Sequence, residues 1–361
     1  MKTSTVLAVA AVTCAAALGS AGGASAATRL AGASHPATVA RWQVIKTVHS
    51  NDMPAFTAMA VTGMHNAWAF ASTSAKTAAW RMEGTAWREV AFPGRSGDQV
   101  LAAGASAPDN VWAFASLRQG SGRALHWDGT RWSVVRQFSK TIGNGLVLGP
   151  RDVWVFGEPY VPGNGLGTWH YDGKTWTRYK NAGALTAASA LSPSSIWAVG
   201  DKTAAHWDGS RWSLTSLAKI LPPDSLVCHS QVTAVYAASP GDVWAAGMGG
   251  CDNLGRAPFV LLHFNGTAWQ RVASVSSYGE PYQVVPDGSG GLWIPVITGF
   301  PGTFSMLHYS GGHLGQVPLP LPGPTMRMGV AHVSGSTVTF GDGASYQDGV
   351  PQAALIFKYS G

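Results

Sequence analysis

The chain has 361 residues, 12 % of them charged, and a formal net charge of +6 at pH 7. Its lysines and arginines form no cluster of the kind that binds nucleic acid, so we expect no nucleic-acid partner. After residue 26, no stretch approaches the roughly 20 consecutive apolar residues of a membrane-spanning helix, and we expect no membrane insertion.

The first 26 residues have the layout of a secretory signal peptide. Lys2 is followed by a run of small apolar residues and then by an Ala-Ser-Ala motif that ends at Ala26. This order predicts cleavage near Ala26 and export of the mature protein. We expect residues 27–39 to form a flexible lead-in, and we expect the secreted protein to be a monomer.

A tryptophan-centred motif recurs along most of the chain at intervals of 42 to 49 residues. It reads NAWAFA in its first copy, DVWVFG in its third and DVWAAG in its fifth. The anchor positions are Trp68, Trp112, Trp154, Trp197, Trp244, Trp293 and, in a degenerate last copy, Val338. A period of this length is typical of propellers, solenoids and related arrays.

A second motif follows the anchors, and in four copies it contains Asp-Gly or Asn-Gly between apolar runs, whereas the first copy reads MEGTAW and the sixth reads YSGGHL. Examples are WDGTRW from Trp127, YDGKTW from Tyr171 and FNGTAW from Phe264. Asp-Gly and Asn-Gly at such places predict β-hairpins with a type I′ turn. Alternating apolar and small residues before each anchor predict a further strand. Each repeat therefore has four expected strands, and the whole chain is predicted to be all-β.

The two ends of the repeat region complement one another. The last repeat stops before its fourth strand, whereas ARWQVI near the N-terminus has the pattern of such a strand, with Trp42 at the tryptophan position. We therefore predict that residues 40–361 form a seven-bladed β-propeller of four-stranded antiparallel blades. The N-terminal strand, with Trp42 beside Phe357–Ser360, completes the last blade, so that no sheet is left with an open end.

Two cysteines remain after the signal, Cys228 and Cys251. The connection that enters the fifth blade and the loop between that blade's second and third strands emerge on one face of a propeller. We therefore expect a disulfide between these cysteines in an exported protein.

Basic residues and small polar residues also recur in register. Histidine or another basic residue stands two places before each Asp/Asn/Ser of the second motif: Arg81, His126, His170, His206, His263, His308 and Lys358. Two places before each anchor stand Asn66, Asn110, Asp152, Ser195, Asp242, Gly291 and Ser336. We expect several of these to pair by hydrogen bonds in a structural role, and we expect the repeated tryptophans to be packing residues.

The combination of DVWAxG, an aliphatic strand and WDGTxW resembles tectonin-type and kelch-like propeller repeats of secreted bacterial proteins, from Ala40 to Gly361. PDGSGGLW from Pro286 is also similar to a repeat of the streptogramin-lyase type. The resemblance implies recognition, because tectonin-type propellers are often lectins that bind sugars through loops on one face.

Loops on a rigid scaffold are where function tends to lie. Long loops are expected after the second strand of five blades, and their candidate ligand-binding residues are Arg118, Glu158, Tyr160, Asn164, Asp252, Asn253, Arg256, Tyr346 and Asp348. We expect a secreted, non-enzymatic module that recognises a glycan or a cell-envelope polymer, with no catalytic residue, no metal site and no cofactor.

Two alternatives stay open at this point. The first is an extracellular lyase or hydrolase at the channel mouth, for which His332 and His229 are the histidines outside the repeat register. The sequence has no GxSxG, HExxH or P-loop motif to support an enzyme. The second is a protein–protein interaction scaffold, which predicts an exposed apolar patch.

Overall fold

The computed structural model describes residues 41–49, 55–72, 76–117, 120–157, 165–253, 256–275, 279–298, 303–319, 325–347 and 350–360. Residues 39–361 form one compact unit. The predicted signal peptide and lead-in, residues 1–39, lie outside the described residues. In the part of the chain that is described, no helix is long and apolar enough to cross a membrane.

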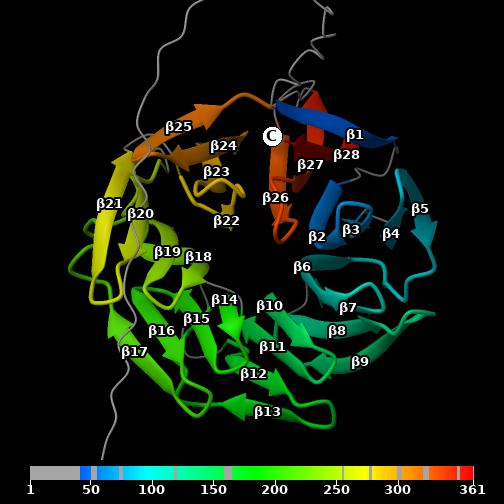
Figure 1. The fold of residues 1–361 in the computed structure, drawn as a ribbon, viewed down its shortest axis with the longest axis horizontal. Helices are drawn as coiled ribbons and strands as arrows, with labels where there is room; N and C mark the ends of the chain where they lie inside the picture. The colour runs from blue at the N-terminus through cyan, green and yellow to red at the C-terminus, as the bar shows by residue number, and fades with distance from the viewer. Residues whose placement is uncertain are drawn as a thin grey trace, which may run out of the picture. The chain divides into compact units, whose positions relative to one another are not determined.

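The described strands form seven four-stranded antiparallel sheets arranged as the blades of a β-propeller (Figure 1). Blade 1 comprises β2 (Ala55–Gly63), β3 (Asn66–Ser72), β4 (Thr77–Glu83) and β5 (Ala86–Val90). Blade 2 comprises β6 (Asp98–Ala107), β7 (Asn110–Leu117), β8 (Ser121–Trp127) and β9 (Trp132–Phe138). Blade 3 comprises β10 (Ile142–Gly149), β11 (Asp152–Gly157), β12 (Thr168–Tyr171) and β13 (Trp176–Tyr179). Blade 4 comprises β14 (Ala187–Ser192), β15 (Ser195–Gly200), β16 (Thr203–Trp207) and β17 (Trp212–Ser216).

The remaining blades follow the same order, except that the last one is assembled from both ends of the chain. Blade 5 comprises β18 (Gln231–Ser239), β19 (Asp242–Met248), β20 (Phe259–Phe264) and β21 (Trp269–Val275). Blade 6 comprises β22 (Val285–Pro286), β23 (Leu292–Thr298), β24 (Thr303–Ser310) and β25 (His313–Val317). Blade 7 comprises β26 (Thr325–His332), β27 (Thr339–Gln347), β28 (Val350–Ser360) and β1 (Arg41–His49).

The predicted ring closure is confirmed. Strand β1 pairs antiparallel with β28, and Trp42 lies opposite Tyr359 in this register. The Trp42 side chain is 3 % exposed and packs edge-on against Trp293 of blade 6 at a ring-centroid distance of 5.3 Å. The N-terminal strand therefore both completes blade 7 and packs against its neighbour.

The second strand of a blade is buried on both faces because the neighbouring blades cover it. In β7, seven of eight residues are buried. The anchor Trp68 of blade 1 contacts Trp127 and Trp132 of blade 2, at centroid distances of 4.9 and 5.2 Å. The anchors Trp68, Trp112, Trp154, Trp197 and Trp293 are all at most 8 % exposed, which confirms that they are packing residues.

The hairpins between third and fourth strands occur where Asp-Gly and Asn-Gly predict them, but the expected turn type is wrong. Trp127 pairs with Trp132 across a four-residue loop, and only Gly129 in that loop has a positive φ, of 94°. The Asp128 carboxylate accepts the N–H groups of Thr130 and Arg131, at 2.8 and 2.9 Å. An aspartate that bonds its own following backbone in this way favours this loop over a type I′ turn.

Side chains of the inner strands, of one second strand and of one connection tie neighbouring blades together by hydrogen bonds. The bonds are Thr57 Oγ1 to Val100 O, Ser116 Oγ to Ile142 O, Ala237 N to Ser189 Oγ, Thr233 Oγ1 to Pro281 O and Val330 N to Gln283 Oε1. These bonds hold the inner strands at fixed positions around the channel.

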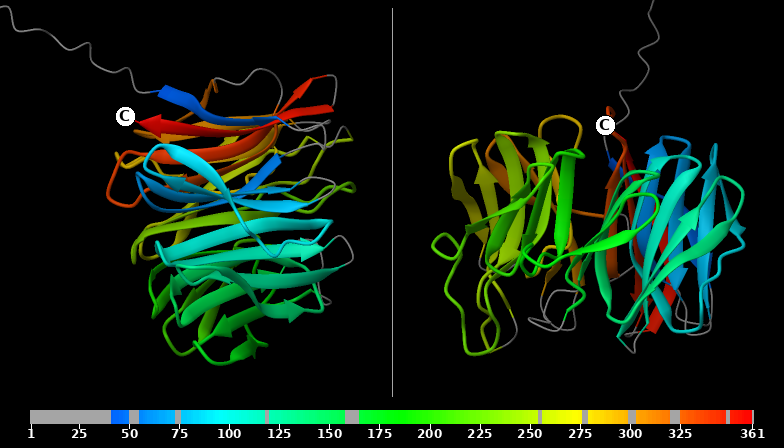
Figure 2. Two further views of the ribbon diagram at one scale, coloured as in Figure 1. Left: turned by 90° about the vertical axis from the view of Figure 1, so that its right-hand side faces the viewer. Right: turned by 90° about the horizontal axis from the view of Figure 1, so that it is seen from below.

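The strands of each blade run between two faces of the ring (Figure 2). We call them the connection face, which carries the blade-to-blade connections and the loops between second and third strands, and the turn face, which carries the other hairpins. Each inner strand starts at the connection face and ends at the turn face.

Candidate functional site

The predicted histidine pairs near the turn face are present in four blades. The Nε2 atoms of the histidines lie 2.7–3.2 Å from the polar side chains: His126 with Asn110, His170 with Asp152, His206 with Ser195 and His263 with Asp242. Each imidazole also lies over the anchor tryptophan of its own blade, as His170 does over Trp154 at a centroid distance of 4.3 Å. These histidines therefore fix the tryptophans and have a structural role.

The other three blades do not form this pair. Arg81 pairs with Glu83 at 3.4 Å and lies over the Trp68 ring, instead of bonding Asn66. Lys358 lies over the Phe340 ring. Position 291 is glycine and has no side chain to offer, so His308 bonds Asp287 at 2.8 Å instead.

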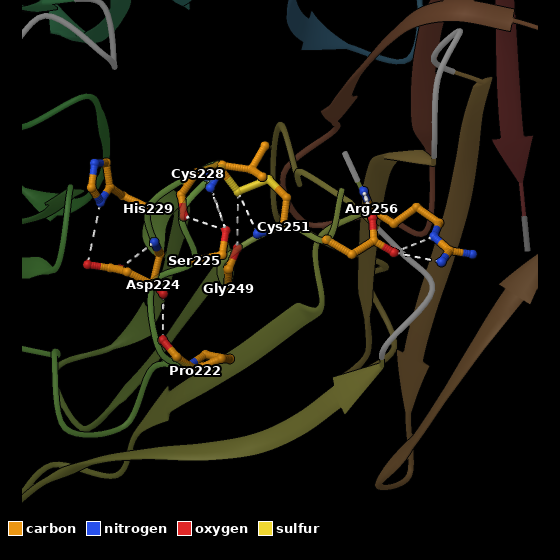
Figure 3. Close-up of a disulfide and its surroundings, with 11 residues drawn as sticks. Pro222, Asp224, Ser225, Cys228, His229, Gly249, Cys251 and Arg256 are labelled. Carbon is orange, nitrogen blue, oxygen red and sulfur yellow. Dashed lines mark hydrogen bonds and ion pairs between the residues drawn. A yellow bond between two sulfur atoms is a disulfide. The ribbon is translucent and has the colours of Figure 1, made fainter. Parts of the chain in front are cut away.

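The predicted disulfide between Cys228 and Cys251 is present on the connection face (Figure 3). It joins the connection that enters blade 5 to the loop that follows β19. Polar contacts hold the same connection: Asp224 pairs with Lys202 at 2.6 Å, and Ser230 Oγ donates to Pro222 O at 2.5 Å. The loop pair is thus fastened covalently and by hydrogen bonds.

The structure describes three of the predicted ligand-binding residues with their side chains, and all three lie in the loop that Cys251 begins. Asp252 accepts hydrogen bonds from Arg256 Nε at 2.7 Å and from the Arg256 N–H at 2.9 Å (Figure 3). Asn253 is exposed between them. Because the aspartate and arginine bind one another, they stabilise the loop, and none of the three residues lines the central cavity described below.

The other predicted residues lie outside what the structure describes. Arg118, Glu158, Tyr160, Asn164 and Asp348 are not among the described residues, and Tyr346 belongs to β27 but its side chain is not described. Their contribution to a site stays a prediction.

A cavity of about 310 Å³ lies on the propeller axis, in the half nearer the connection face. All seven blades line it, and its lining includes Thr57, Met59, Leu101, Asn144, Thr186, Thr233, Tyr282, Gln283 and Phe304. The side toward blades 1 and 2 is apolar, with Met59 and Leu101. The side toward blade 6 carries two aromatic rings among polar side chains.

Tyr282 is the most exposed large hydrophobic residue in this cavity. Its side chain is 43 % exposed, and its ring lies 5.3 Å from the ring of Phe304. Backbone bonds to β23 hold it in place, because the Tyr282 N–H donates to Pro295 O at 3.0 Å and Pro281 forms a bridge to Val296. An exposed aromatic ring is thus presented from a fixed backbone.

Hydrogen bonding within the wall determines which polar groups a ligand would meet. The hydroxyls of Thr57, Thr186 and Thr233 donate to backbone carbonyls, so their oxygens are left as acceptors. Asn144 Oδ1 accepts the Gly145 N–H at 2.7 Å, and Gln283 Oε1 accepts the Val330 N–H at 2.6 Å. The NH₂ groups of both amides are left as donors.

The sequence interpretation missed this cavity because it looked for function in the loops between second and third strands. Tyr282 lies in the connection between blades 5 and 6, where the sequence SSYGEPYQ breaks the repeat pattern with two tyrosines and a glutamate. This departure from the repeat was the feature of the sequence that could have pointed to the cavity. In the described parts of the chain, no group of three or more His, Cys, Asp or Glu side chains is placed to hold a metal ion.

Comparison with known proteins identifies the fold of this chain but not its function. Neither protein families nor curated proteins give a match. Among solved structures, the chain is similar to YCF48 bound to a D1 peptide, with 14 % identity, a TM-score of 0.56, and coverage of 89 % of this chain and 97 % of that one. It is also similar to inactive virginiamycin B lyase from Staphylococcus aureus with quinupristin, with 11 % identity, a TM-score of 0.55, and coverage of 89 % and 99 %.

A third similar structure is the GH74 xyloglucanase from Xanthomonas campestris. The identity is 11 %, the TM-score is 0.54, and the match covers 80 % of this chain and 51 % of that one. These structures include a peptide-bound protein, a lyase and a hydrolase, and at such identities they establish the propeller fold alone.

Proposed function

We propose that this protein is secreted and binds a glycan or cell-envelope polymer in the axial cavity at the connection face, without catalysing a reaction. The observation that carries the proposal is Tyr282, an exposed aromatic ring with a fixed backbone beside hydrogen-bonding side chains in a cavity. A sugar ring has apolar C–H faces and hydroxyl edges, and this combination matches an aromatic ring flanked by donors and acceptors.

The size and polarity of the cavity support this ligand class. A volume of about 310 Å³ suits one or two sugar units of a polymer. The NH₂ groups of Asn144 and Gln283 can donate to the hydroxyl groups of a sugar ring stacked on Tyr282, and the threonine oxygens can accept from them. The apolar side of the cavity, with Met59 and Leu101, offers an apolar contact to the opposite face of the sugar.

Export is supported by the signal-like first 26 residues and by the disulfide. Structural disulfides persist in oxidising compartments outside the cytosol. Mass spectrometry of the protein from culture medium should find a mature chain that begins near Ala27, with Cys228 and Cys251 joined. A full-length chain retained in the cytosol would contradict export.

Glycan binding is tested by a glycan array with purified residues 27–361, followed by calorimetry on any ligand that binds. Tyr282→Ala should weaken binding by about tenfold, because an aromatic stacking contact contributes up to about 1.5 kcal/mol. Tyr282→Phe, which keeps the ring, should bind nearly as well.

The matched control is Leu214→Ala on the outer strand of blade 4, where Leu214 is 51 % exposed and does not line the cavity. It should leave binding unchanged. No binding to any neutral or acidic glycan, or equal binding by Tyr282→Ala and the wild type, would overturn the proposal.

A second candidate function is contact with another protein, which one feature of the connection face favours. Leu226 and Val227 are 107 % and 56 % exposed, at a turn closed by the bond from the Ser225 N–H to Cys228 O. A photo-crosslinking residue at position 226 should give an adduct with one exported protein, and the same residue at exposed position 214 should not. Equal adducts from both positions would reject this function.

A further inference from the structure

A second cavity, of about 550 Å³, lies at the turn face, on the side of the ring away from the axial cavity's opening. Blades 5, 6 and 7 line it, with Tyr236, Asp242 and Trp244 from blade 5, Gly288, Gly290 and Gly291 from blade 6, and His332, Ser334, Gly335 and Ser336 from blade 7. Asp242 and His332 stand at the turn-face ends of β19 and β26.

The cavity exists because the first hairpin of blade 6 has few side chains. The loop after β22 reads Asp287-Gly-Ser-Gly-Gly, and Gly288 and Gly290 have positive φ angles of 82° and 90°. A side chain at Gly288 would collide with the backbone oxygen of Ser336. Blade 6 also has no side chain at position 291, where blade 5 has Asp242. Space is therefore left between Asp242 and β26, the inner strand of blade 7.

Blade 5 places a tyrosine where no other comparable blade has one. Tyr236 lies opposite the anchor Trp244 across the β18–β19 pair. The residues opposite the anchors of blades 1, 2, 3, 4 and 6 are Ala60, Gly104, Leu146, Ser189 and Val285. The Tyr236 phenol is therefore an addition to the repeat, and it points to a role specific to this cavity.

Three side chains of this cavity, those of Asp242, Tyr236 and His332, can offer hydrogen-bond acceptors. Asp242 uses Oδ1 to pair with His263 at 2.8 Å, and its side chain is 45 % exposed. His332 Nδ1 lies 3.2 Å from Thr339 Oγ1, so that Nε2 accepts when Nδ1–H donates to that hydroxyl. Burial lowers the pKa of His332, which the charge of Asp287 opposes only in part, so the imidazole is neutral at pH 7.

The charge balance of the cavity is negative. Its lining contains the Asp242 carboxylate and no lysine or arginine. Burial, followed by the charge of Asp242, raises the pKa of Tyr236, so the phenol stays protonated and its oxygen accepts. A positive group with several N–H donors complements these three acceptors and the negative charge of Asp242.

We propose that the turn-face cavity binds a primary ammonium group, carried by a small organic amine or by an amino sugar. The ammonium would donate to Asp242, to Tyr236 Oη and to His332 Nε2, which matches its three N–H donors to three acceptors. This site is separate from the glycan site of the proposed function, because it lies on the opposite face and shares no lining residue with it.

The test is calorimetric titration of residues 27–361 with two amine probes, 1,4-diaminobutane and glucosamine, at pH 7. N-acetylglucosamine, whose nitrogen is neutral, is the matched control ligand. We expect both amines to bind and the acetylated sugar to bind at least about tenfold more weakly, since a hydrogen bond to a charged group contributes on that scale. Binding by glucosamine alone would assign the site to amino sugars, and binding by both probes would assign it to amines in general.

Two substitutions connect the binding to the named atoms. Asp242→Asn should weaken amine binding by about tenfold, and Tyr236→Phe by a smaller factor. Asp152→Asn in blade 3 is the control, because it changes the equivalent histidine pair of a blade that does not line the cavity. It should leave amine binding unchanged and should reveal any effect of the pair on folding, measured by circular dichroism.

Three results would overturn the proposal: no binding of either amine, equal binding of N-acetylglucosamine, or unchanged amine binding by Asp242→Asn. Tyr282→Ala separates this site from the proposed glycan site. It should weaken glycan binding by about tenfold and leave amine binding intact, so failure of one proposal is distinguishable from failure of the other.

Discussion

His308 Nε2 lies 2.8 Å from Oδ2 of Asp287, although Asp287 stands four residues before the position that supplies the polar partner in other blades. The carboxylate also accepts the N–H groups of Ser289 and Gly291, at 2.6 and 2.8 Å. Blade 6 therefore keeps the histidine–acid pair of the repeat, but its acid comes from a different position in the loop.

Asp287→Ala should destabilise the propeller by about 1–3 kcal/mol, because it leaves two backbone N–H groups and His308 without their acceptor. Asp287→Asn should cost less, since the amide oxygen keeps part of these bonds. Unfolding in guanidinium chloride measures both variants. Equal stability of the wild type and Asp287→Ala would show that the carboxylate does not hold this turn.

The stability of the wild type should also fall in acid because of Asp287. Burial by itself would raise the pKa of this carboxyl, but the bonds from His308, Ser289 and Gly291 outweigh it and hold the pKa below the ordinary 3.8. A lowered folded-state pKa contributes stability above pH 3.8 that is lost as the pH falls through the folded value. Asp287→Asn should lack this component, as unfolding curves from pH 5 downward will reveal.

His126 and His206 predict a second pH dependence, at higher pH. Burial lowers the pKa of both imidazoles below the ordinary 6.5, so the unfolded chain binds more protons than the folded chain near that pH. Stability should therefore decrease as the pH falls below about 6.5. His126→Gln, which keeps a side chain that can bond Asn110, should reduce the slope between pH 7 and 5. An unchanged slope in this variant would contradict the assignment.

Trp42→Ala tests the ring closure. Trp42 is 3 % exposed and contacts Trp293, Phe357 and Tyr359, so its removal should cost about 3–5 kcal/mol. Val44→Ala on the same strand, where Val44 is 36 % exposed, should cost far less. Thermal unfolding of the two variants gives the comparison, and similar losses from both would argue against Trp42 as the anchor of β1.

Replacing both cysteines with serine tests the connection-face disulfide. The cysteines are 23 residues apart in the sequence, and a cross-link of this span contributes about 2–4 kcal/mol. The double variant should unfold at lower denaturant concentration than the oxidised wild type and should match the wild type treated with a reductant. If reduction changes nothing, the loops are held by Asp224 and Ser230 without the disulfide.

The architecture could be predicted from the sequence because the repeat indicates which residues occupy equivalent positions in different blades. The pairing of Trp42 with Tyr359 follows from one missing strand, and the Cys228–Cys251 bond follows from the direction of two strands. The histidine pairs were predictable for the same reason in the blades that keep both partners, such as His170 with Asp152.

The site residues could not be read in this way, because they depend on departures from the repeat. Asp287 reaches His308 only through a glycine-rich turn whose path has no counterpart in other blades. Tyr282 is placed by bonds to Pro295 and Val296, which lie on another strand. The turn type at Asp128 was wrong because its carboxylate bonds the local backbone and selects a different loop.

The union of β1 with β28 sets an order of events during synthesis. Residue 42 cannot pair with residue 359 before that residue has been synthesised, so the ring stays open until then, and closing so long a segment is slow. Until then, blade 7 has a bare strand edge that invites pairing with another chain. Loss of either terminus would leave that edge permanently available, and the expected consequence is self-association of truncated chains.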